Sequence, residues 1–99
     1  MFVILTSKPG QFRTEPGEGL HPVEQWDFLL NGRKRAGFVI AEITGKPRVT
    51  IVDETPPQVI NRIPAKLLQR YDSVERARRE IEGLANGGTG YRLQRVNPD

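Results

Sequence analysis

The sequence predicts an α+β fold in which an antiparallel β-meander sheet is covered on one face by a single C-terminal amphipathic helix. Three observations support this class. Short β-rich runs follow one another with turns between them, which is typical of antiparallel strands. One of these runs, 33–44, is apolar on both faces, as expected of a central strand that lies under a helix. A 3.6-residue apolar period over 73–85 supplies that helix.

The same pattern allows an alternative fold, a small and partly open β-barrel with the helix as a plug. In either case the 99 residues are expected to form a single globular α+β domain, 1–99. A chain of this length can bury one modest core without disulfides or a structural metal.

The N-terminal part of the chain is expected to begin with a strand and continue as a loop. The run FVILTS, at 2–7, combines β-branched and apolar residues and is predicted to be the first strand. Residues 9–22 contain three prolines and three glycines, which predicts a long irregular loop with a brief extended piece at 12–14. Loops of this length in compact domains tend to be functional or mobile.

The second strand is expected at 23–30, and a hairpin should join it to the third. Asn31-Gly32 is the usual signal for a two-residue type I′ turn. A three-residue loop that ends in a left-handed Gly32 would instead place Lys34 opposite Phe28. The second register is favoured because it gathers large side chains on one buried face. That face would consist of Trp26, Phe28, Ala36, Phe38 and Ile40.

The second half of the chain is expected to contain two strands and one clear helix. The run RVTIVD at 48–53 predicts a fourth strand, and YRLQRV at 91–96 predicts a final one. Between them, the proline-rich segment 54–64 should be extended, with Val59-Ile60 either as a short edge strand or simply packed down. Residues 65–71 have weak helical character.

The helix at 73–85 is the clearest element of the sequence. Asp72 is expected to cap its N-terminus in a capping-box-like arrangement, and 86–88 (Asn-Gly-Gly) to end it. On the solvent face, Arg78 is expected to pair with Glu82, four residues on. The apolar stripe that should pack on the sheet consists of Val74, Ala77, Ile81, Leu84 and Ala85.

The composition excludes several kinds of site. The absence of cysteine removes disulfides, thiolate nucleophiles and cysteine-ligated metals, and a single histidine removes a histidine-rich metal site. We therefore expect no metal and no cofactor.

The N-terminus lacks the features of a signal peptide and no apolar run is long enough for a membrane span, so a cytoplasmic protein without membrane contact is expected. A net charge of +3 supports only weak attraction to polyanions.

Few side chains suggest catalysis, because only His21, Glu42 and Asp53 could serve as acid–base groups, and no second histidine or nucleophile accompanies them. We therefore expect a non-enzymatic accessory or adaptor domain that mediates protein–protein interaction or self-association, within a larger assembly or as a homodimer. Its irregular proline-rich segments are typical docking features.

The alternative is an RNA- or DNA-binding module that uses the basic hairpin tip and the arginines of the last strand. The favoured hairpin register weakens this alternative, because it separates two basic residues of the tip from the third. The candidate binding residues are Phe12, Arg13, His21, Arg33, Lys34, Arg35, Pro56, Pro57, Arg92 and Arg95.

Overall fold

The computed structural model describes residues 1–85 and 90–96, which form two antiparallel sheets and one α-helix. Sheet A has the strand order β1-β4-β3-β7, where the strands are β1 (Phe2–Ser7), β4 (Arg33–Ile43), β3 (Leu20–Leu30) and β7 (Tyr91–Val96). Sheet B has the order β2-β5-β6, with β2 (Phe12–Glu15), β5 (Arg48–Asp53) and β6 (Ile60–Pro64). A short 3₁₀ turn, η1 (Ala65–Leu67), and the helix α1 (Val74–Ala85) lie between β6 and β7.

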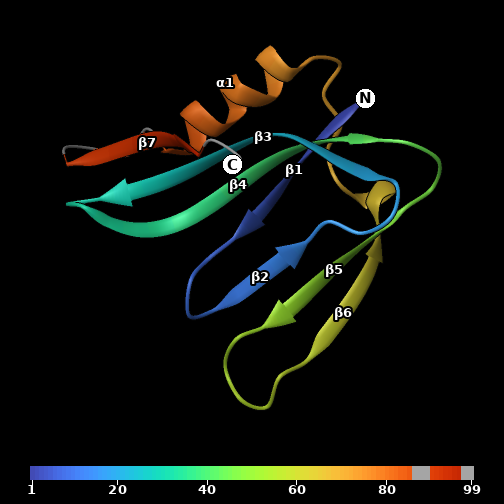
Figure 1. Ribbon diagram of the computed structural model, residues 1–99, viewed down its shortest axis with the longest axis horizontal. Coiled ribbons are helices and arrows are strands. Elements are labelled where there is room, and N and C mark those ends of the chain that lie inside the picture. The colour runs from blue at the N-terminus through green and yellow to red at the C-terminus, as the bar shows by residue number, and fades with distance from the viewer. Residues whose placement is uncertain (86–89, 97–99) are drawn as a thin grey trace.

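These elements form three layers, with sheet A in the middle. Figure 1 shows α1 across one face of sheet A and sheet B on the other side. The predicted α+β class, with its antiparallel sheet and single C-terminal helix, is confirmed, and the sheets are not closed into a barrel. The strands divide into two sheets because β4 is apolar on both faces, and one helix covers only one of them. Sheet B covers the other.

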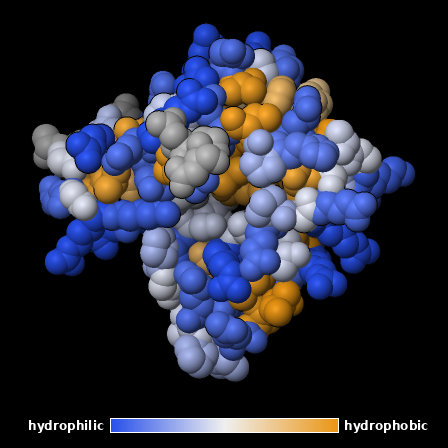
Figure 2. All heavy atoms as spheres, in the orientation of Figure 1, coloured by the Kyte–Doolittle hydropathy of each residue, from blue (hydrophilic) through white to orange (hydrophobic). Residues whose placement is uncertain are grey.

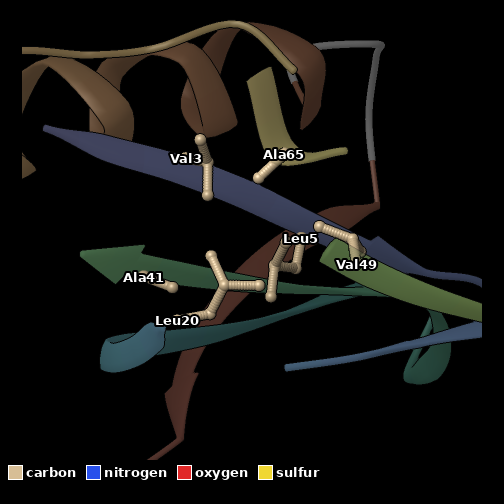
Figure 3. Close-up of a cluster of buried hydrophobic side chains, with 6 residues drawn as sticks. All are labelled: Val3, Leu5, Leu20, Ala41, Val49 and Ala65. Carbon is tan, nitrogen blue, oxygen red and sulfur yellow. The ribbon is translucent and has the colours of Figure 1, made fainter. Parts of the chain in front are cut away.

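Each face of sheet A has its own hydrophobic core. Beneath α1, the core consists of Ala36, Phe38, Ile40, Ala77 and Ile81. Between the two sheets it consists of Val3, Leu5, Leu20, Ala41, Val49 and Ala65, which Figure 3 shows coming from β1, β3, β4, β5 and the start of η1. Strands β1 and β4 contribute to both cores because successive side chains of a strand point to opposite faces.

Two β-bulges in the β3–β4 pair decide which side chains of β3 face the helix. At the first, Val23 is an extra residue between Pro22, which is opposite Ala41, and Glu24, which is opposite Ile40. The bulge reverses the facing of the residues that follow it. Leu20 consequently packs between the sheets, whereas Glu24, four residues later, lies on the helix side.

The hairpin register differs from the one that was favoured. Leu30 is opposite Arg33, and Asn31 and Gly32 have φ of 52° and 80°, as in a two-residue type I′ turn. The expected aromatic face nevertheless forms, because Arg35 is an extra residue in β4 and shifts the pairing beyond it. Lys34 is opposite Leu29 rather than Phe28, so the prediction for Lys34 was wrong.

Three details of the C-terminal half also differ from expectation. Ser73 caps α1, since its Oγ accepts the Arg76 N–H at 3.1 Å, whereas Asp72 pairs with the Arg76 side chain at 3.3 Å. Leu84 is 61% exposed and does not belong to the buried stripe. The glycine-rich helix stop at 86–88 lies outside the described residues. Within the described ranges, no helix is long and apolar enough to cross a membrane.

Candidate functional site

Five basic side chains surround two adjoining hollows at the end of sheet B where β5 begins. The larger hollow has a volume of about 910 Å³ and the smaller about 380 Å³, which together exceed the space that a single small ion needs. Both are lined by Lys46, Pro47 and Arg48, so the two hollows adjoin at these residues and make up a two-part depression. We call this depression the basic crevice, and its cations are Lys46, Arg48, Arg62, Lys66 and Arg70.

The turn between β4 and β5 is fixed by backbone contacts on both sides. On one side, Thr44 donates its N–H to the Gly19 carbonyl at 2.9 Å. Gly19 has φ of +84°, and a Cβ there would lie 2.8 Å from the Thr44 oxygen, so only glycine fits this approach. On the other side, Ala65 donates to the Pro47 carbonyl at 3.0 Å. These hydrogen bonds therefore hold the backbone of the crevice in place without a ligand.

The crevice carries a local excess of positive charge. All five cations are exposed, and within 1–85 and 90–96 none of them has a carboxylate at ion-pair distance. Among the residues that the structure describes, Glu18 is the only acidic side chain that lines either hollow. Like charges that gather without counter-charges raise the local potential and attract anions.

His21 is the one predicted site residue that lines the crevice. Its Nε2 lies 2.9 Å from the Thr44 Oγ1 at the edge of the larger hollow. Of the other two groups that could support acid–base chemistry, one lies beside His21 and the other does not. Glu42 is the cross-strand neighbour of His21, but Asp53 lies at the opposite end of β5 from Arg48.

The basic residues of the hairpin tip lie at the other end of the molecule. Strand β4 separates Arg33 from the crevice, and its 11 residues extend over about 35 Å. Lys34 forms an ion pair with Asp27 at 3.2 Å, and Arg35 lines a separate hollow beside Phe28 and α1. Arg92 joins this group, since it is opposite Leu29, the residue that Lys34 also faces.

Another four predicted site residues gather at the far end of sheet B. The segment after β5 docks on the turn before β2, where Glu54 donates its N–H to the Gln11 carbonyl at 2.9 Å. The residues of this group are Phe12 and Arg13 in β2, and Pro56 and Pro57 in the exposed turn before β6. Arg13 is paired, with its Nε 2.9 Å from the Glu15 Oε1.

Arg95 belongs to a charge cluster around the buried Glu24 carboxylate, which links α1 to sheet A. The Glu24 carboxylate accepts two hydrogen bonds from Arg78, at 2.9 and 2.7 Å, and one from the Trp26 indole at 2.7 Å. Arg95 lies 3.8 Å from the same carboxylate. The Arg78 hydrogen bonds lower the pKa of Glu24 to about 2, although burial acts in the opposite direction. Arg78 thus pairs across the layers instead of with Glu82, as the sequence had suggested.

Most of the crevice was missed at the level of sequence, because its residues come from segments that are distant along the chain. None of its five cations is among the ten predicted binding residues. A signal was available, since residues 43–52 and 55–71 contain these five cations and no acidic residue. Such acid-free basic segments are candidates for an anion-binding surface.

The side chains of the crevice restrict the kind of ligand that it can bind. In the parts of the chain that the structure describes, no three histidine, aspartate or glutamate side chains gather as metal ligands would. The side chains of the crevice are suited to binding an anionic group. Comparisons with protein-family models, with curated proteins and with solved structures gave no significant match.

Proposed function

We propose that this chain is a non-enzymatic accessory domain that binds an acidic segment of a partner protein in the basic crevice. The observation that carries the proposal is the set of five exposed cations without ion-pair partners among the described residues. Their charge is available to a ligand, which favours both association rate and selectivity for acidic partners. A crevice that two hollows extend can accommodate several consecutive residues of such a segment.

The lining of the crevice favours a protein partner over nucleic acid. Sites for single-stranded nucleic acid usually stack bases on aromatic rings. Neither hollow is lined by Phe, Tyr or Trp among the residues that the structure describes. In addition, Lys46 lies at the other end of β4 from Arg33, so the hairpin tip cannot extend this surface. The side chains that line the crevice therefore offer a nucleic acid mainly contacts to its phosphates.

The proposal is tested by reversing two charges of the crevice. Arg48→Glu combined with Arg62→Glu should weaken the binding of a fluorescein-labelled hexaglutamate peptide about tenfold or more, because two attractive charges become repulsive. Fluorescence anisotropy at several salt concentrations gives the affinities. The matched control is Arg33→Glu combined with Arg35→Glu, which makes the same charge change at the hairpin tip and should leave the affinity nearly unchanged.

The same titrations distinguish the partner classes. A short DNA duplex and a single-stranded RNA of equal net charge serve as competing probes at equal ionic strength. Tighter binding of either nucleic acid than of hexaglutamate, with a steep salt dependence, would overturn the proposal in favour of a nucleic-acid module. Equal loss of peptide affinity in the crevice variant and in the hairpin variant would show that net charge alone, and not the crevice, binds the peptide.

A further inference from the structure

We propose that the acidic segment binds as an additional β-strand along the outer edge of β6, which borders the crevice. This inference rests on the proposed function and names the form in which the partner binds. Strand β6 is the last strand of sheet B, and Figure 1 shows it at the margin of that sheet. Arg62 belongs both to β6 and to the crevice, so a chain along this edge would meet the crevice cations directly.

The alternation of the β5–β6 ladder shows which backbone groups of β6 are free. Asp53 donates its N–H to the Val59 carbonyl at 2.9 Å, so these two residues form a hydrogen-bonded pair. In an antiparallel ladder, hydrogen-bonded and non-hydrogen-bonded pairs alternate. Ile60, opposite Val52, and Arg62, opposite Thr50, are therefore non-hydrogen-bonded pairs.

The N–H and C=O groups of Ile60 and Arg62 consequently point away from β5. Among the described residues, no hydrogen bond is formed by any of these four groups. They constitute a short open edge of the kind on which extended peptides are added to a sheet. Pro64 ends this edge, because proline has no N–H to donate.

The side chains beside this edge indicate what kind of strand fits it. Ile60 is 62% exposed and Val59 is 45% exposed, and Figure 2 shows an apolar patch where the first half of β6 lies in Figure 1. Ile60 and Arg62 lie two residues apart and share one face of the strand. An added strand should therefore place an apolar side chain next to Ile60 and a carboxylate next to Arg62, at a spacing of two residues.

A second copy of this chain is a poorer occupant of the edge. Pairing of two β6 edges would bring the crevice cations of both copies close together, and like charges on neighbouring strands are destabilising. The open edge therefore selects against self-association and for an acidic strand. This charge complementarity identifies the occupant as a partner segment with alternating acidic and apolar residues.

Amide hydrogen exchange tests the geometry of binding. The probe is a synthetic peptide, ETVTETV, which places Glu and Val two residues apart. On addition of the peptide, exchange at the Ile60 and Arg62 amides should slow by about tenfold or more, because their N–H groups gain partners. The Asn61 and Ile63 amides are already in the β5–β6 ladder and should change little. Equal slowing at all four amides, or none at Ile60 and Arg62, would contradict strand addition.

A proline substitution tests the edge without changing its charge. Ile60→Pro removes an outward N–H and leaves the β5–β6 ladder bonds in place, so the affinity for ETVTETV should fall about five- to tenfold. Ile60→Val keeps the N–H and is the matched control. Hexaglutamate binding, which depends on the crevice charges, should be retained in both variants.

These results separate the two proposals. If Ile60→Pro binds ETVTETV as tightly as Ile60→Val does, while Arg48→Glu with Arg62→Glu still loses hexaglutamate, strand addition is wrong and the crevice proposal stands. If the charge-reversed variant keeps its affinity for both peptides, the proposed function fails, and the strand proposal fails with it.

Discussion

At the residue scale, the Glu24 carboxylate links α1 to sheet A through its contacts with Arg78 and Arg95. Its side chain is only 5% exposed, and a buried carboxylate is costly unless it is paired and hydrogen-bonded. Arg78 supplies two hydrogen bonds from α1, and Trp26 supplies one from β3. Replacement of Glu24 or Arg78 would leave the other charge in the layer between α1 and sheet A without its hydrogen-bonded partner.

The lowered pKa of Glu24 predicts how stability depends on pH. Its pKa falls from the usual 4.5 to about 2 in the folded protein, mainly through the Arg78 hydrogen bonds. A lowered pKa stabilises the folded state above pH 4.5, and this stabilisation is lost as the pH falls from 4.5 towards 2. At neutral pH the contribution should be about 3 kcal/mol. Glu24→Gln should lose that amount, and urea unfolding at a series of pH values measures it.

The exposed ion pair of the helix provides the control for this prediction. Asp72 and Arg76 are 3.3 Å apart, and their side chains are 60% and 68% exposed. Such surface pairs contribute little, so Asp72→Asn should change the pH profile far less than Glu24→Gln. If Glu24→Gln and wild-type protein lose stability in parallel between pH 4.5 and 2, the Glu24 pair does not cause the acid sensitivity.

At the scale of elements, two members of the predicted apolar stripe on α1 have different roles. Ile81 is fully buried in the core beneath the helix, whereas Leu84 is 61% exposed. Ile81→Ala should lower the free energy of unfolding by about 2–5 kcal/mol, because it leaves a cavity that the sheet cannot fill. Leu84→Ala makes a comparable change on the same helix and should have a much smaller effect in urea unfolding. Equal losses would mean that α1 packs with a different face.

The strands and the helix could be predicted from the sequence, but their pairing could be predicted only in part. Hydrophobic periodicity places α1 and identifies β4 as a central strand, because both signals are local. The bulges at Val23 and Arg35 are not visible in that periodicity, since each depends on what the partner strand buries. Glu24 carries a signal in hindsight, because a carboxylate on the same face of β3 as Trp26 requires a buried partner.

At the scale of the whole molecule, the crevice is a product of tertiary structure. It combines the turn between β4 and β5 with β6 and the segment after η1, which only the packing of sheet B brings together. Of the ten predicted binding residues, only His21 lies there. The basic cluster at the hairpin was the stronger local pattern, but β4 separates it from the crevice. A cluster of basic residues in the sequence therefore predicts that a basic surface exists, but it does not predict where on the fold that surface lies.

The arrangement of the two cores predicts that the molecule unfolds as one unit. Ile40 lies beneath α1 and its neighbour Ala41 lies between the sheets, so β4 cannot leave one core and keep the other. Val49→Ala, in the core between the sheets, should destabilise the protein by about 2 kcal/mol. Trp26, the single tryptophan, packs in the other core and reports on it by fluorescence. In urea, the Val49→Ala midpoint should shift equally by Trp26 fluorescence and by far-UV circular dichroism. A fluorescence midpoint that stays at its wild-type value while the dichroism midpoint falls would show that sheet B unfolds separately.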